Sequence, residues 1–212
     1  MQIDLFHDTA CPWCRIGKRH LQLALAQWDG EPVQVRYRTF FLNERIPAAG
    51  EDFKPYMTAK AGGRVPLEQM FAGPSQAGER VGLRFDFEAI SRAPNTLLSH
   101  RLIALTPDSH KEAVIDAIYA AYFEQGRDIG DLAVLVDIAG AAGLDQDSMR
   151  TLLQSDAAQE QALADARWAQ QAGISGVPFF IVDNKYAWNG AQPPEAILQM
   201  LKQIARGPVP GT

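Results

Sequence analysis

The chain has 212 residues, 47% of them hydrophobic, which is enough to bury a substantial core in one large domain or in one domain that carries an insertion. Its 20 Lys and Arg residues against 25 Asp and Glu give a net charge of −5 without a basic run, which argues against a nucleic-acid-binding protein. The sequence has no apolar stretch long enough for a transmembrane helix and no secretory signal before its first predicted strand, so we expect a cytoplasmic protein with no membrane partner.

The first predicted elements are a buried strand over residues 2–8 and a helix over residues 12–28. The only two cysteines of the chain, Cys11 and Cys14, lie on the turn between them. Two cysteines separated by two residues in this context are typical of a redox-active dithiol. The sequence therefore predicts that thiol chemistry begins at this turn.

The roles of the two cysteines follow from their positions on the predicted helix. Cys11 is expected at the N-cap and Pro12 at the first helical position, where a missing N–H costs nothing. A Cys11 thiolate would face unpaired N–H groups and the positive end of the helix dipole, so we expect a lowered pKa and a nucleophile. Cys14 is then the resolving thiol. Arg15 and Lys18 are expected to be long, exposed side chains. Solvent and salt would screen their positive charges, so they would contribute little to stabilising the Cys11 thiolate.

Two simpler interpretations of the cysteines are less favoured. A structural zinc site needs four ligands, and the chain has no second Cys-x-x-Cys and no suitable histidine pair, so no metal is expected. A permanent disulfide across so short a loop would contribute little stability. Histidines are more often structural than catalytic, so none of the four is assigned a catalytic role; they are His7, His20, His100 and His110.

A second strand is predicted from the alternating pattern of residues 33–39, followed by the apolar run Phe40-Phe41-Leu42. Strand, helix and strand in this order indicate a parallel pairing with the dithiol on the first crossover. From Asn43 to about residue 165 the pattern becomes helical and predicts an insertion. Residues 51–80 are expected to hold two short helices around a loop. The clearest helices of the insertion are predicted to begin near Asn95-Thr96, Thr106-Pro107, Asp131 and Asp147.

The last part of the chain returns to strands. An Ala-rich helix is predicted over residues 157–172, with Gly173 after it. Residues 177–182 and 186–188 then form a predicted hairpin, and Pro193-Pro194 begins a final helix. The expected fold class is therefore α/β with an inserted α-helical domain.

Several short motifs together resemble the DsbA-like thioredoxin-fold oxidoreductases, and within them the FrnE-type proteins. The matching segments are Cys11-Pro12-Trp13-Cys14, Phe41-Leu42-Asn43, Gly82-Leu83-Arg84-Phe85, Asn95-Thr96, His100-Arg101-Leu102, Gly176-Val177-Pro178 and Gly190-Ala191-Gln192. The resemblance covers almost the full length and implies a thioredoxin-like fold interrupted by a helical domain. The predicted boundaries are residues 1–43 and 166–212 for the thioredoxin-like domain and 44–165 for the insertion.

The resemblance also implies the activity: disulfide exchange on a protein or small-molecule substrate through a redox-active Cys11–Cys14 disulfide, with no bound cofactor. Glutathione is a possible co-substrate, and glutathione or a thioredoxin-like system would be the reducing partner. It further implies that Pro178 is cis and lies against the dithiol, where the Val177 backbone would pair with substrate. From the residues alone, a trans proline at the start of a strand would be the simpler interpretation.

Trp13 departs from the periplasmic relatives, which have His at this position. An indole cannot become a cation beside the thiolate, so the protein is expected to be a weaker oxidant than those relatives. In a reducing compartment it would act as a reductase or isomerase.

Two alternative functions stay open. Kappa-class glutathione transferases and 2-hydroxychromene-2-carboxylate isomerases share the region of Asn95 and the element order, but they typically have Ser where this chain has Cys11. In that case Asn95 would line a small-molecule pocket, although a cap for the following helix is at least as plausible a role. A chaperone or interaction module, with exposed Trp13 and Phe71, is the third hypothesis.

Overall fold

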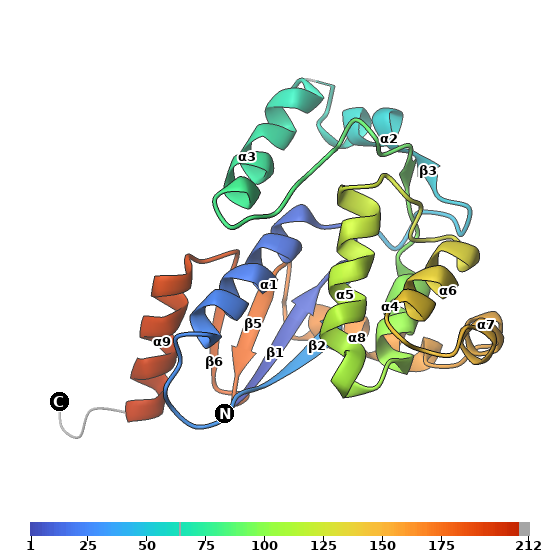
Figure 1. Cartoon of the computed structure of the whole chain (residues 1–212). Helices are drawn as coiled ribbons and strands as arrows, with labels where there is room; N and C mark the ends of the chain where they lie inside the picture. Colours follow the sequence, from blue (N-terminus) through green and yellow to red (C-terminus); the bar gives the residue numbers. More distant parts are fainter. Residues whose placement is uncertain (64, 208–212) are drawn as a thin grey trace.

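A four-stranded mixed sheet forms the centre of the protein, as shown by a computed structural model that describes residues 1–63 and 65–207 (Figure 1). The strand order is β2-β1-β5-β6. β1 pairs in parallel with β2 and antiparallel with β5, and β5 pairs antiparallel with β6. The strands are β1 (Gln2–His7), β2 (Gln34–Thr39), β5 (Phe179–Val182) and β6 (Tyr186–Asn189). The predicted α/β class is confirmed.

Alternation along β1 sends its side chains to the two faces of the sheet. Ile3 and Leu5 are fully buried in one apolar cluster with residues of α1 (Pro12–Leu25) and α9 (Pro194–Arg206), which cover that face. Phe6 belongs to a separate cluster on the opposite face. There α8 (Gln159–Gln171) contacts β2. The sheet is thus packed between helices, as the buried β1 pattern predicts.

The segment between β2 and α8 is mostly helical, as expected (Figure 1). It contains α2 (Phe53–Lys60), α3 (Leu67–Glu79), α4 (Leu97–Leu105), α5 (Asp108–Phe123), α6 (Leu132–Ala141) and α7 (Gln146–Gln154). Two short strands, β3 (Glu51–Asp52) and β4 (Arg92–Ala93), pair antiparallel within it. The sequence did not predict them, because two residues are too few to show a period. The predicted domain boundary between residues 165 and 166 falls inside α8. The division into two domains stays a prediction.

The predicted end of the first helix is wrong. α1 ends at Leu25 rather than at residue 28, because the last residues form a tighter turn. Gln27 N–H donates to the carbonyl of Ala24 and Trp28 N–H donates to that of Leu25, both at 3.1 Å. The apolar side chain of Trp28 still packs on the sheet cluster, which explains why its spacing looked helical.

Aspartate caps mark two helix starts in the insertion. The Asp131 carboxylate accepts a hydrogen bond from Val134 N–H at 3.0 Å, as predicted for the start of α6. At α7 the cap is Asp145, which accepts from Ser148 N–H at 2.8 Å, and the predicted start near Asp147 is therefore too late. Both residues have the oxygen that an N-cap needs, so the sequence alone did not separate them.

Asp4 has a large expected effect on stability, because its buried carboxylate holds two cations of β2. Arg36 donates from Nε and Nη2 at 2.8 and 2.7 Å, and Arg38 donates from Nε at 2.9 Å. Burial raises the pKa of Asp4, but the hydrogen bonds and charges of Arg36 and Arg38 outweigh it and lower the pKa overall. The carboxylate therefore stabilises the fold above the unfolded-state pKa, and this stabilisation is lost as the pH falls through the folded-state value.

We expect Asp4→Asn to lower the free energy of unfolding by about 2 kcal/mol near neutral pH, since Arg36 would lose its anion and Arg38 would keep only Asp165. Urea unfolding of both proteins at about pH 7 and about pH 3 checks this. The difference between them should shrink in acid, where the wild-type carboxyl group also loses its charge. A difference that stays constant over this range would contradict the assigned role.

Candidate active site

The turn between β1 and α1 places both cysteines as the sequence predicts. Cys11 is the N-cap residue of α1, with extended backbone angles, and Pro12 is the first helical residue. Cys11 N–H donates to the Asp8 carbonyl at 3.0 Å, which closes the turn after the strand. The Cys11 carbonyl in turn accepts from the N–H groups of Cys14 and Arg15 at 3.1 and 3.3 Å. The first turn of α1 is therefore built around Cys11.

The two thiols differ in access to solvent and in acidity. Both are free thiols; Cys11 is 4% exposed and Cys14 is 0% exposed. Burial raises the pKa of Cys14 well above its ordinary value, and a hydrogen bond with Cys11 and the charge of that sulfur raise it further. The backbone of Asp8 opposes this shift. Cys14 is thus held protonated behind Cys11, and of the two cysteines only Cys11 has any exposed surface.

A loop far away in the sequence completes the site. The Cys11 Sγ donates to the Val177 carbonyl at 3.8 Å, and the Val177–Pro178 peptide bond is cis. The Pro178 ring lies directly on Gly17 of α1, where a Cβ atom would be 2.7 Å from the Pro178 Cγ. Glycine at position 17 therefore lets the loop approach the helix that carries the cysteines.

Asp8 is a buried acid beneath this turn that sequence reasoning missed. Its carboxylate accepts from the N–H groups of Ala10 at 3.1 Å and Leu42 at 2.7 Å. Burial raises the pKa of Asp8, although these hydrogen bonds act in the opposite direction. An acid directly after a buried strand and three residues before Cys11 was the available signal.

The expectation that Arg15 and Lys18 are exposed and screened is wrong. Arg15 donates to the Arg84 carbonyl at 2.6 Å and to the Glu124 carboxylate, and its side chain is 7% exposed. Lys18 is 2% exposed and donates to Asp116 at 2.8 Å. Both point from α1 toward the insertion, which covers them. Their charges are compensated by acidic partners, so they hold the helix in place.

Trp13 presents an apolar surface beside the dithiol. Its side chain is 42% exposed, and its indole ring lies 3.7 Å from the position a Cβ would take on Gly73 of α3. Phe71, on the same helix, is only half-exposed because it stacks between Phe53 and Phe87. The expectation that Phe71 is exposed is therefore wrong. An open cavity of about 260 Å³ lies over this aromatic stack.

Asn95 lines a cavity of about 200 Å³ together with Phe41, Glu44 and Leu163. Its amide nitrogen donates to the Ile46 carbonyl at 2.7 Å, and its oxygen accepts from Leu97 N–H at 3.0 Å. Both polar groups of the side chain are thus hydrogen-bonded to the backbone at the start of α4. The N-cap residue of α4 is Thr96, so Asn95 lies one position before the predicted cap and its side chain closes a local turn there.

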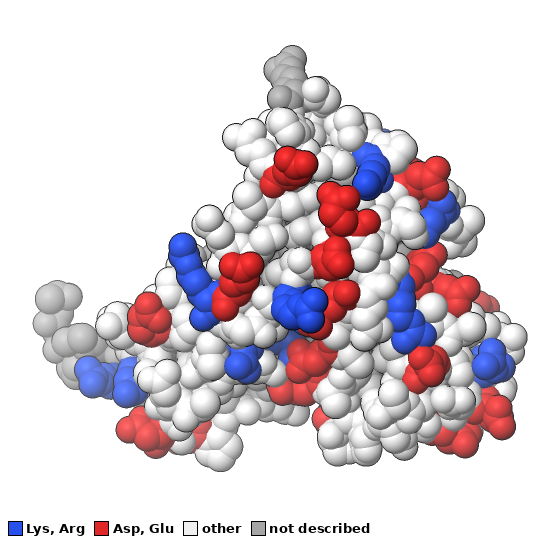
Figure 2. All heavy atoms as spheres, turned by 45° about the horizontal axis from the view of Figure 1, so that its top comes forward, with Lys and Arg blue, Asp and Glu red and all other residues white. Residues whose placement is uncertain are grey.

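The charged surface near the insertion carries both signs. On the face in Figure 2, acidic and basic side chains are interspersed among uncharged ones, which keeps the surface field weak.

Across residues 1–63 and 65–207, no group of three His, Cys, Asp or Glu side chains is arranged to hold a metal ion. None of the helices in these residues combines the length and apolarity needed to cross a membrane.

Comparisons with known proteins agree with this geometry. The family model for the DSBA-like thioredoxin domain matches residues 2–202. A probable DsbA oxidoreductase from Streptomyces coelicolor is 33% identical and superposes with a TM-score of 0.89, over 100% of this chain and 93% of that one.

More distant structures share the fold alone. The cytosolic disulfide reductase DsbM from Pseudomonas aeruginosa with GSH is 16% identical with a TM-score of 0.67, over 97% of this chain and 100% of that one. A 2-hydroxychromene-2-carboxylate isomerase is 15% identical with a TM-score of 0.68, over 97% of this chain and 95% of that one. The narrower FrnE-type assignment stays a prediction. By its sequence and its fold, the chain belongs to the DSBA-like thioredoxin domain family.

Proposed function

We propose that this protein is a thiol-disulfide oxidoreductase that uses Cys11 and Cys14 as its redox dithiol. The observation that carries the proposal is the placement of Cys11 at the N-cap of α1, facing the Val177 carbonyl, with Cys14 fully buried behind it. Such a pair has one thiol for attack and one for resolution.

The proposed reaction transfers two electrons from the Cys11–Cys14 dithiol to the substrate disulfide. The Cys11 thiolate attacks one sulfur of the substrate disulfide, which forms a mixed disulfide and releases the first substrate thiolate. Cys14 loses its proton and attacks the Cys11 sulfur, which releases the second substrate thiolate and leaves a Cys11–Cys14 disulfide. The substrate is reduced and the protein is oxidised. Glutathione or a thioredoxin-like partner would then restore the dithiol.

The surroundings of Cys11 favour an extended peptide or a small disulfide as the substrate. The Val177 backbone lies beside the sulfur, and Trp13 offers an exposed apolar ring. Main-chain pairing with such a loop accepts many sequences. We place the protein in the cytoplasm, where it would be kept reduced and act as a reductase or isomerase. The structural likeness to a reductase described as cytosolic and as bound to GSH supports that placement and glutathione as the co-substrate.

Equilibration with defined mixtures of reduced and oxidised glutathione tests the proposed function. Alkylation of the remaining thiols followed by mass spectrometry counts the oxidised and reduced forms. We expect an all-or-none change of two thiols with a single midpoint. A protein whose thiols neither exchange nor form a mixed disulfide with glutathione would overturn the proposal.

Replacing Trp13 with His is expected to make the dithiol more oxidising. An imidazolium beside Cys11 would stabilise the thiolate and hence the reduced form, by about tenfold in the equilibrium with glutathione, or about 30 mV. Trp13→Phe is the matched control, since it keeps an apolar ring without a cation. If Trp13→His changes neither the Cys11 titration nor this equilibrium, residue 13 does not control the potential.

The transferase or isomerase alternative is less well supported by the structure. It needs Asn95 as a pocket group, but both ends of that side chain are hydrogen bonded to the backbone. Glutathione affinity without any disulfide exchange in the wild-type protein would favour this alternative. Suppression of client aggregation that survives the loss of both cysteines would instead favour a chaperone.

A further inference from the structure

Two buried histidine nitrogens have no hydrogen-bond partner among the described residues. They are the Nε2 atoms of His7, at the end of β1, and of His100, on α4. The two rings meet edge to face with centroids 5.3 Å apart. Both line a cavity of about 40 Å³ that reaches Lys111 and the exposed Gln161. A cavity of this size with polar groups in its wall accommodates a water molecule.

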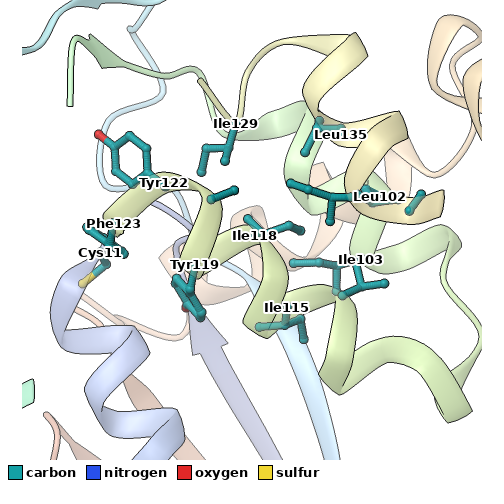
Figure 3. Packing of buried hydrophobic residues seen from close by; sticks show 14 of the residues in the cluster. Cys11, Leu102, Ile103, Ile115, Ile118, Tyr119, Tyr122, Phe123, Ile129 and Leu135 are labelled. Atoms are coloured by element: carbon teal, nitrogen blue, oxygen red, sulfur yellow. The ribbon is translucent and has the colours of Figure 1, made fainter. Parts of the chain in front are cut away.

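The other nitrogen of the His7 ring faces a tyrosine hydroxyl of the insertion. Its Nδ1 lies 2.8 Å from the hydroxyl of Tyr119 on α5. The same hydroxyl lies 3.4 Å from the Asp8 carbonyl oxygen, which also accepts Cys11 N–H. Tyr119 packs in one buried cluster with Cys11 and Cys14, and Figure 3 shows Phe123 of the same helix beside Cys11 and Tyr119 farther along that helix. His7 thus connects the cavity on one side with the Tyr119 hydroxyl on the other.

Proton removal is a requirement of the second step of the proposed reaction. Cys14 has no exposed surface, and burial holds its pKa high, so near neutral pH solvent takes the proton only slowly. Tyr119 lies in the same buried cluster as Cys14, and after burial the charge of Cys14 contributes most to raising the pKa of Tyr119. The Asp8 carboxylate accepts two backbone N–H groups, and its Oδ1 lies 3.9 Å from His100 Nε2.

The nearby cations are also occupied. Lys18 is paired with Asp116, and Arg15 with Glu124. On the cavity side, Lys111 is paired with Asp108, and Asp165 is held by Arg38. The Tyr119 hydroxyl and the His7 ring form an uncharged hydrogen-bonded pair that lies between the buried cluster containing both cysteines and the cavity.

We propose that Tyr119 and His7 relay the proton of Cys14 to the cavity beside His100, a role that rests on the proposed function. The Cys14 S–H gives its proton to the Tyr119 oxygen, Tyr119 gives its own proton to His7 Nδ1, and His7 Nε2 releases a proton to water in the cavity. The Cys14 thiolate then attacks the Cys11 sulfur. The substrate thiolate that leaves takes up a proton from solvent.

The relay needs no charged imidazole. Burial, assisted by the charges of His100 and Lys18, lowers the pKa of His7 well below its ordinary value, and burial lowers that of His100 to about 3. His7 therefore only changes from one neutral tautomer to the other. In the final state the Tyr119 hydroxyl donates to the Asp8 carbonyl and accepts from His7 Nδ1–H. When the disulfide is reduced again, the same protons return by the reverse path.

Tyr119→Phe tests the relay, because it removes the hydroxyl and keeps the ring. The reduced protein is mixed with an aromatic disulfide whose thiolate product absorbs light, so Cys11 attack and the closing attack by Cys14 appear as two phases. We expect the first phase to be unchanged and the second to slow by about 100-fold near neutral pH. The solvent deuterium isotope effect on closure should change, and the rate should recover toward wild type at high pH as hydroxide deprotonates Cys14.

The matched control is Tyr122→Phe, on the same helix. Its hydroxyl is also buried but donates to the Arg92 carbonyl at 3.2 Å, so both phases should match wild type. His7→Gln is a second variant of the relay and should also slow closure. It provides the test if Tyr119→Phe does not fold. Closure at the wild-type rate and pH profile in both relay variants overturns the relay alone. If the wild-type protein shows neither phase, the proposed function is overturned, and the relay is overturned with it.

Discussion

Cys11→Ser is expected to abolish disulfide exchange, with a loss of at least about 10³-fold, because a serine hydroxyl stays protonated where a thiolate must attack. Cys14→Ser is expected to give a different result. Its Cys11 still attacks, but the buried resolving thiol is missing, so the mixed disulfide accumulates. The two single substitutions thus separate the two steps that the geometry assigns to the two sulfurs.

Mass spectrometry after mixing with oxidised glutathione measures this difference. Cys14→Ser should gain one glutathione per chain and Cys11→Ser should gain none. Circular dichroism serves as the control for folding, since each change replaces one buried sulfur by oxygen in the same cluster. A glutathione adduct on Cys14 in the Cys11→Ser protein would contradict the assignment, because it would show that the buried thiol is the accessible one.

Gly17→Ala is expected to damage both stability and reactivity. The added methyl group would lie 2.7 Å from the Pro178 Cγ and 3.4 Å from the Phe180 ring, closer to the proline than packed carbon atoms come. We expect the free energy of unfolding to fall by about 1–3 kcal/mol as the loop is pushed from α1. Val177 would move with Pro178, so its carbonyl would no longer meet Cys11 and exchange would slow.

Gly176→Ala is the matched control for this substitution. It lies in the same loop, but the added methyl group would meet no atom within 4 Å. Urea unfolding and glutathione exchange of the two variants should therefore differ, with Gly176→Ala close to wild type. Equal effects would show that the loop is sensitive to any substitution and that the contact between Gly17 and Pro178 is unimportant.

The parts of this site that depend on local sequence were predictable. Cys11 as N-cap and Pro12 as first helical residue follow from backbone rules that act within one turn. The strands around them follow from alternation of apolar residues. The position of the Val177–Pro178 loop against the dithiol came from family resemblance rather than from the residues themselves.

The parts that depend on tertiary contacts were not predictable. Tyr119 and His7 meet although they lie 112 residues apart, and neither has a local pattern that points to the other. The exposure of Arg15 and Lys18 was wrongly predicted for the same reason. Their hydropathy indicates a solvated face, whereas the insertion folds back over them and supplies acids at the right places.

The ion pairs of α1 with the insertion have a consequence for cooperativity. Separating α1 from α5 would strip Lys18 and Arg15 of their partners and leave buried cations without counter-charges, which is costly. The nucleophile-bearing helix α1 and the inserted helix α5 therefore belong to one cooperative unfolding unit, although about 80 residues of chain separate them. The dithiol is then carried by a rigid body, and substrates must adapt their shape to it.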